Sequence, residues 1–169
     1  QGEVTVGSTS VRILVEIGVE HGLPVADCLA GTGLDEAALA DPRTAVTPGH
    51  EFDVIRNLLR RLGAAQPGLA IEAGSRYHLA LHGAWGLAIA TSRTVREAVD
   101  IGGRYGELGW VFVTFSFAEV DGEAVLGIDS GHIPADVRTF LVERNSAATQ
   151  VFIRDVLGTG LPLTAVRFR

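Results

Sequence analysis

The sequence predicts an α+β domain. Its N-terminal two-thirds is mostly helical, and a small antiparallel sheet packed on helices and one long C-terminal helix follow. Two observations support this class. Apolar residues recur at helical spacing in several segments before residue 110, and the pattern then changes to a run rich in aromatic and β-branched residues. With 169 residues, 47% of them hydrophobic and 20% charged, the chain fits one domain over residues 1–169. A domain of this size buries enough surface to fold without disulfides or a structural metal.

Three short helices are predicted at the N-terminal end. The first spans residues 10–22, with Ser10 as its cap and a glycine as its end. A second short piece covers residues 24–30. Asp35 then caps a helix of one or two turns, which stops at an Asp-Pro pair at 41–42.

Two further helices begin at clear capping signals. Thr47 and Pro48 supply an N-cap and a first helical residue, and the apolar residues that follow recur at a spacing of three to four until Gly63. Thr94 and Glu97 form a capping-box pattern, which opens a helix that ends near residues 102–103.

The period then changes to that of a sheet. Residues 110–117 and 124–128 predict two strands, and the Asp-Gly pair at 121–122 is a strong hairpin turn between them. Pro134 opens the longest helix, which runs to about residue 157 and is closed by Gly158. Residues 163–168 are predicted to form a late strand that completes the sheet.

Composition excludes several classes of function. The formal net charge is −6, all 14 basic residues are arginines and these are scattered, which argues against direct nucleic-acid binding by this chain. The longest apolar run, residues 79–91, is too short to span a bilayer, so no membrane role is expected. The single cysteine, Cys28, fits a reducing compartment, and we expect a cytoplasmic protein. Since the sequence contains no methionine, it is expected to be a fragment, with residues 1–2 a possible tag remnant.

Catalytic and metal motifs are weak. His78 and His82 are four residues apart, which would place both on one helical face, but no third ligand follows closely, so no metal or cofactor is expected. The run Asp129-Ser-Gly-His132 holds the residue types of a hydrolytic triad, but neighbouring residues cannot adopt its relay geometry, and a turn is expected there. Cys28 is expected to be a small buried hydrophobe.

A candidate pocket lies between residues 76 and 112, where most of the amphipathic aromatics and two histidines gather. Ligand sites combine apolar walls with a few placed polar groups. The alternative interpretation is that the tryptophans are plain core residues and the histidines are solvated. The candidate ligand-binding residues are Arg76, His78, His82, Trp85, Tyr105, Trp110 and Phe112.

Several segments follow one another in a recognisable order. A Gly-x-x-Gly segment at 83–86 precedes a Thr-Ser-x-Thr-x-x-Glu-Ala motif at 91–98 that opens a helix, and segments 33–42, 67–70 and 163–168 accompany them. This ordered set resembles the N-terminal arabinose-binding-like domain of AraC/XylS-type bacterial transcription regulators, in the ornithine-regulator subgroup. The resemblance implies an effector-sensing and dimerisation domain, with a DNA-binding helix-turn-helix domain beyond residue 169. It lends no catalytic residues, and the arabinose label is not transferred, because too few strands are predicted for a sugar-binding jelly roll.

We therefore expect a small organic effector, for example a carboxylic acid, to enter between the sheet and the preceding helices. The strand at 110–117 would form the apolar wall, and Arg76, His78 or His82 would supply polar recognition, with arginine suited to gripping a carboxylate. The long helix is the expected homodimer contact, because its apolar face is broad. The candidate interface residues are Phe140, Ala148, Val151 and Phe152.

Two other classes stay open at this point. One is a small cofactor-independent hydrolase or isomerase, in which His82 would work with a carboxylate such as Glu72 or Asp129. The other is an interaction scaffold that dimerises and binds no small molecule. The sequence disfavours the enzyme, because it contains no arrangement that would activate a nucleophile.

Overall fold

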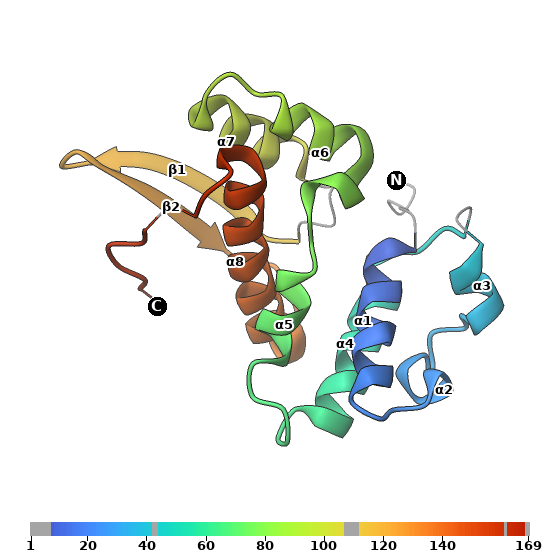
Figure 1. Cartoon of the computed structure of the whole chain (residues 1–169). Coiled ribbons are helices and arrows are strands. Elements are labelled where there is room, and N and C mark those ends of the chain that lie inside the picture. The colour runs from blue at the N-terminus through green and yellow to red at the C-terminus, as the bar shows by residue number, and fades with distance from the viewer. Residues whose placement is uncertain (1–7, 42–43, 107–111, 161, 168–169) are drawn as a thin grey trace.

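A computed structural model describes residues 8–41, 44–106, 112–160 and 162–167 of the chain. The described residues form helices on both sides of a long C-terminal helix, together with one hairpin (Figure 1). The predicted α+β class is confirmed. No helix among the described residues combines the length and hydropathy that a membrane crossing requires.

The N-terminal helices form a group at one side of the molecule, drawn in blue to teal (Figure 1). α1 packs against α2 and α4. The approach is close at Gly18, where an added Cβ would lie 2.5 Å from the sulfur of Cys28. The four helices are α1 (Thr9–Glu20), α2 (Val25–Cys28), α3 (Glu36–Ala40) and α4 (Pro48–Leu62).

Three of the four predicted N-caps are confirmed. The fourth, Ser10, is wrong, because α1 begins at Thr9 after Ser8 and Ser10 is a buried residue within the helix. The Asp35 carboxylate accepts a hydrogen bond from the Ala38 N–H at 2.7 Å. Thr47 caps α4, and His50 completes a capping box by accepting from the Thr47 N–H at 3.2 Å. Thr94 caps the later helix by accepting from Glu97 N–H, but the Glu97 side chain accepts from the Arg93 N–H and not from Thr94.

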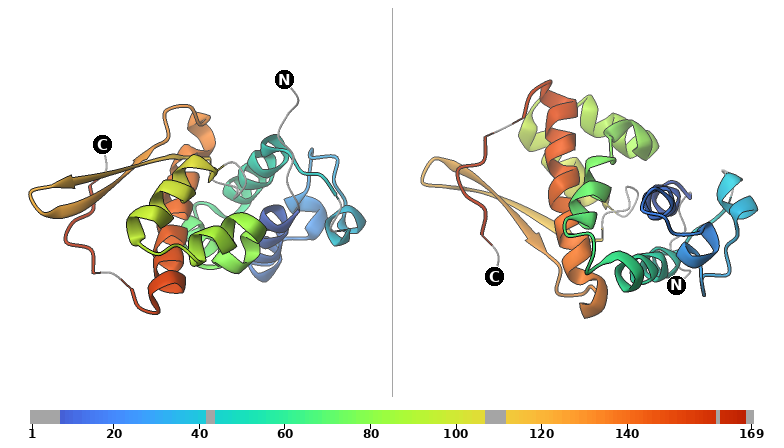
Figure 2. Two further views of the ribbon diagram at one scale, coloured as in Figure 1. Left: turned by 90° about the horizontal axis from the view of Figure 1, so that it is seen from above. Right: turned by 60° about the horizontal axis from the view of Figure 1, so that its bottom comes forward.

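The centre of the molecule is the crossing of a short helix, α5 (Leu69–Ser75), and the long helix, α8 (Ala135–Leu157), as the two views of Figure 2 show. Gly74 permits this crossing, because an added Cβ would lie 2.2 Å from the Arg144 carbonyl oxygen and 3.1 Å from the Ala148 nitrogen. The sequence predicted α8 but not α5.

Three more helical segments lie at the C-terminal end of α8 (Figure 1). They are a 3₁₀ turn η1 (Leu79–His82), α6 (Gly83–Ala90) and α7 (Val95–Arg104). Gly86 allows α6 to lie against η1, since an added Cβ there would lie 1.9 Å from the Leu79 carbonyl oxygen.

The hairpin consists of β1 (Thr114–Val120) and β2 (Glu123–Asp129), paired antiparallel with Phe117 opposite Leu126. Asp121 and Gly122 both have positive φ, 53° and 81°, as the predicted two-residue turn requires. The Arg96 guanidinium lies 5.1 Å from the centre of the Phe117 ring, which places α7 against the sheet as predicted.

The predicted late strand at 163–168 is wrong for the residues that the structure describes there. Residues 162–167 form no strand, and the described sheet has two strands. Leu163 and Val166 are 59% and 62% exposed, so the apolar side chains that suggested a strand find no partner to pack against.

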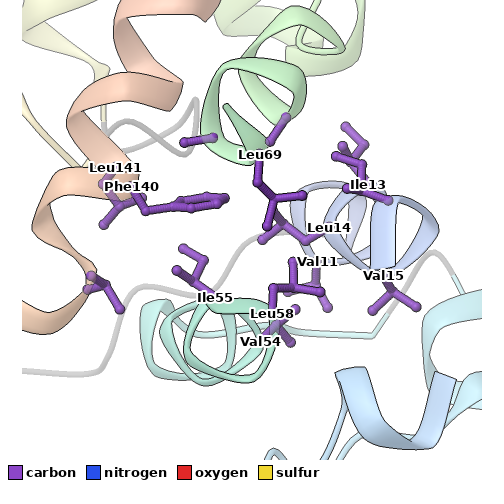
Figure 3. Close-up of a cluster of buried hydrophobic side chains, with 14 of the residues drawn as sticks. Val11, Ile13, Leu14, Val15, Val54, Ile55, Leu58, Leu69, Phe140 and Leu141 are labelled. Atoms are coloured by element: carbon purple, nitrogen blue, oxygen red, sulfur yellow. The ribbon is translucent and has the colours of Figure 1, made fainter. Parts of the chain in front are cut away.

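The core has two parts. The larger joins α1, α4, α5 and α8, and Figure 3 shows Leu14, Ile55 and Phe140 pointing into it from three of these helices. The smaller contains Leu79, Trp85, Ile89 and Ala98, with Phe152 packed against both. Cys28 is buried in the larger part, and burial raises the pKa of its thiol, in keeping with the predicted structural role.

Candidate functional site

An apolar groove runs between α6, α7, the hairpin and the last three turns of α8. Its volume is about 100 Å³. None of the described residues that line the groove is charged. The lining residues are Trp85, Ile89, Val95, Ala98, Val99, Gly102, Gly103, Phe115, Leu126, Thr149, Phe152, Ile153, Val156 and Leu157.

The walls follow from the local sequence. α6 is apolar on every side, and it buries Trp85 and Ile89 against its neighbours while exposing Leu87. Side chains alternate between the two faces of β1, and Phe115 lies on the face toward the groove. It belongs to the strand that the sequence analysis expected to form an apolar wall. The Thr149 hydroxyl is occupied, since it donates to the Asn145 carbonyl at 2.7 Å.

His82 lies behind this groove in an aromatic cluster. Its ring centre is 5.9 Å from that of Tyr77, 5.3 Å from that of Trp85 and 5.2 Å from that of Phe152. The side chain is buried, and neither ring nitrogen has a hydrogen-bond partner among the described residues. Burial, with a contribution from the charge of Arg144, lowers the pKa of His82 to about 4, so the ring is neutral at physiological pH.

Trp85 likewise has a buried polar atom without a hydrogen-bond partner among the described residues. It is 5% exposed and lines the groove, and its Nε1 has no hydrogen-bond partner in the part of the chain that the structure describes. Buried indole N–H groups are usually bonded, because an unpaired donor costs free energy. Trp85, which lines the groove, and His82, which lies behind it, therefore hold three buried polar atoms that have no partner among the described residues.

Arg76 and His78 lie outside the groove. Arg76 donates to Glu20 at 2.8 Å and to Glu72 at 2.7 Å, in an ion-pair network that joins α5 to the end of α1. His78 precedes η1 in an extended conformation and bonds Asp155 at 3.2 Å. It does not share a helical face with His82, because the helical turn begins only at the next residue.

The remaining candidates are dispersed. Tyr105 is 50% exposed at the end of α7. It borders a wide surface hollow of about 620 Å³, which is lined by eight residues of the single stretch 93–105, five of them charged. Phe112 packs edge-to-face on Phe52 with ring centres 5.2 Å apart. Trp110 lies outside the described residues. Of the seven ligand candidates, the groove region gathers His82 and Trp85.

A buried polar network escaped the sequence analysis. The Arg144 guanidinium donates to the Glu51 carboxylate and, at 3.4 Å, to the Tyr77 hydroxyl, which also bonds Ser10. Burial raises the pKa of Tyr77 to about 12, which keeps the phenol neutral. Only the rule that buried charges are paired could have indicated such a network, and that rule does not identify the partner of Arg144.

The four dimer candidates contact other parts of their own chain. Phe140, Ala148 and Val151 are 3%, 5% and 6% exposed within the core. Phe152 joins the aromatic cluster, with its ring centre 5.8 Å from that of Trp85. In the described structure the broad apolar face of α8 is therefore covered from several sides by this chain itself.

The weak catalytic motifs adopt structural roles. Asp129 accepts from the Gly131 N–H at 2.9 Å in a turn, and His132 bonds the Phe112 carbonyl at 2.8 Å. Glu72 bonds His21 and Arg76. Since neither nitrogen of His82 has a partner, no described carboxylate orients it as a base. The described residues also contain no cluster of three or more potential metal ligands.

Apolar walls with a few buried polar atoms are features that ligand-binding sites share. Comparisons with known proteins agree. Residues 22–169 match the family described as the arabinose-binding domain of AraC transcription regulators, N-terminal. The chain therefore belongs to this family of regulator domains, and the resemblance seen in the sequence is confirmed at the family level. Its assignment to the ornithine-regulator subgroup stays a prediction.

Two curated relatives support the same assignment. Both are described as uncharacterised HTH-type transcriptional regulators, one from Mycobacterium bovis and one from Mycobacterium tuberculosis. Each is 36% identical over 156 residues, which is 92% of this chain and 44% of the relative. The chain thus spans less than half the length of these relatives. No solved structure matches it.

Proposed function

We propose that this domain senses a small organic effector, and that the effector binds in the groove between α6, α7, the hairpin and α8. The observation that carries the proposal is Trp85, a buried groove residue whose Nε1 finds no partner in the described part of the chain. A protein that needed Trp85 only for packing would gain stability by bonding this donor or by replacing it with an apolar ring. A ligand that accepts a hydrogen bond from Trp85 Nε1 would remove the cost of this unpaired donor.

The charges support a neutral effector over the carboxylic acid expected from the sequence. Arg76, the expected carboxylate anchor, already bonds Glu20 and Glu72. No charged side chain lines the groove among the described residues. A carboxylate placed there would lose its hydration without gaining a counter-ion, which is costly.

Toluene is a suitable first probe, because it is neutral, apolar and small. We expect saturable shifts of the methyl NMR resonances of Ile89 and Ile153 when toluene is added to the purified chain. Val99→Phe fills the groove and should weaken toluene binding at least about tenfold. Val120→Phe makes the same change on an exposed strand end and should leave binding unchanged. Unshifted groove methyls at saturating toluene would refute the assignment.

The names of the two relatives allow a proposal about the longer protein to which this domain would belong. Because their names describe helix-turn-helix regulators, we infer that DNA is contacted through a separate helix-turn-helix part, as the acidic charge of this chain also favours. The groove includes Phe152, Val156 and Leu157 near the C-terminal end of α8. An effector bound there touches the segment that leads out of the domain, which is a direct route for passing on the binding event.

Homodimerisation is the second part of the proposal. Since the apolar face of α8 is covered, the hairpin is the better-supported contact surface. Val120 and Val125 are 51% and 45% exposed on the same face of the sheet. Two-stranded sheets are marginally stable alone, so pairing with a second copy would stabilise this one.

A further inference from the structure

The three unpartnered atoms at the groove define a hydrogen-bonding pattern. Trp85 Nε1 is a donor only. The neutral ring of His82 has one donor nitrogen and one acceptor nitrogen, whichever tautomer is present. The aromatic cluster therefore offers two donors and one acceptor to any molecule that reaches it.

The positions of the two rings set the size of the matching group. The centres of His82 and Trp85 are 5.3 Å apart and the rings are inclined at 70°. The two side chains are therefore neighbours, and one oxygen atom placed beside both rings could lie within about 3 Å of one nitrogen on each. One small polar group can thus bond one nitrogen of each side chain.

The kind of group follows from what each side chain needs. A hydroxyl accepts from the Trp85 N–H and donates to the acceptor nitrogen of His82. A carbonyl or a carboxylate only accepts, so it can bond N–H groups but leaves the acceptor nitrogen of His82 unpaired. A sugar has several hydroxyls, and the apolar walls of the groove would leave most of them without partners, at a cost in affinity.

Building on the proposed function, we infer that the effector is a neutral molecule with an apolar body in the groove and one hydroxyl between Trp85 and His82. The apolar part contacts side chains such as Ile89, Val99 and Val156. The small volume of the groove, about 100 Å³, suits a body about the size of one aromatic ring or a short alkyl chain.

Four one-ring probes test the inference, because they differ in little but their polar group. Toluene has none, benzaldehyde accepts only, benzyl alcohol accepts and donates, and benzoate carries a charge. Affinities for the purified chain are measured by NMR titration at pH 7.5. We expect benzyl alcohol to bind about fivefold more tightly than toluene, benzaldehyde to lie between them, and benzoate to bind at least about tenfold more weakly than benzyl alcohol.

The indole N–H resonance of Trp85 is a second readout that needs no change at the site. Trp110→Phe leaves Trp85 as the only tryptophan of the chain, so its resonance is assigned directly. Benzyl alcohol should move this resonance downfield as the new hydrogen bond forms, and toluene should not. L-arabinose should move neither this resonance nor those of the groove methyls.

The outcomes separate the two claims. If neither toluene nor benzyl alcohol shifts the groove methyls, the proposed function fails. If toluene binds but benzyl alcohol is no tighter and leaves the indole resonance in place, the hydroxyl assignment alone is overturned. Equal binding of benzaldehyde and benzyl alcohol would overturn the hydroxyl donation to His82, and tight binding of benzoate or L-arabinose would overturn the neutral, single-hydroxyl class.

Discussion

The guanidinium of Arg144 on α8 donates to the carboxylate of Glu51 on α4, and the two side chains are 1% and 0% exposed. The pair joins helices that are 93 residues apart in sequence. Arg144 also lies 5.1 Å from the centre of the Tyr77 ring, so the segment that follows α5 takes part in the same contact. A buried charge pair at this place ties the N-terminal helices to the central crossing.

We expect Glu51→Gln to lower the free energy of unfolding by about 3–5 kcal/mol, because it leaves the Arg144 charge buried without its counter-ion. Asp136→Asn is the matched control. It removes the carboxylate of an ion pair with Arg56 whose side chains are 36% and 55% exposed, and it should cost at most about 1 kcal/mol. Urea unfolding followed by circular dichroism measures both. Equal losses in the two variants would contradict the role of the buried pair.

The His82 ring predicts a dependence of stability on pH. Its pKa is about 4 in the folded protein and about 6.5 in the unfolded chain, so the unfolded state takes up the proton first as the pH falls. The contribution of His82 is complete above pH 6.5 and is lost between pH 6.5 and pH 4, by about 3 kcal/mol.

Urea unfolding of the wild type and of His82→Leu at several pH values between 7.5 and 4.5 tests this dependence. The difference in stability between the two proteins should change across this range in favour of the variant, because the variant has no ring to protonate. A constant difference would show that His82 titrates normally and is not buried as described.

The crossing of α5 and α8 predicts an intolerant glycine. Gly74→Ala places a Cβ 2.2 Å from the Arg144 carbonyl oxygen, so the helices must separate, and we expect a loss of about 1–3 kcal/mol. Gly103→Ala is the control, because the nearest atom to its added Cβ lies at 3.8 Å and alanine favours the helix. Thermal unfolding should therefore show a lower Tm for the first variant and an unchanged or higher Tm for the second.

Dimerisation through the hairpin predicts that Val125→Glu shifts the purified chain from dimer to monomer, because a charge would have to be buried in the contact. Val19→Glu is matched to it, since both valines are 45% exposed but Val19 lies on α1. Sedimentation velocity measures the distribution. A dimer that survives Val125→Glu, or a wild type that is monomeric at all concentrations, would refute this surface.

Local signals predicted much of the fold. Asp35, Thr47 and Thr94 mark helix starts because a cap depends only on residues three or four positions away. The turn at Asp121 and Gly122 is local in the same sense. The strand at 163–168 was wrong, because a strand needs a neighbour, and no pattern within one segment reports whether a neighbour is present.

Only part of the candidate groove could be predicted, again because local patterns do not report which distant segments pack together. The density of aromatic residues drew attention to His82 and Trp85. The groove, however, also needs Phe115, Thr149 and Val156 from elements far apart in sequence, and only their packing brings these together. Arg76 looked like a ligand anchor because one of its two carboxylate partners, Glu20 on α1, lies 56 residues away in sequence, and the sequence alone does not place it beside Arg76.

One rigid helix serves both the buried charge pair and the groove. Arg144 and Phe152 are eight residues apart on α8, a separation of about 12 Å along its axis. Any tilt of α8 that widens the groove must therefore also work against the contact with Glu51. By thermodynamic linkage, such a tilt would couple the strength of that distant pair to the affinity for the proposed effector, so that weakening the pair would change binding without altering an atom that this effector touches.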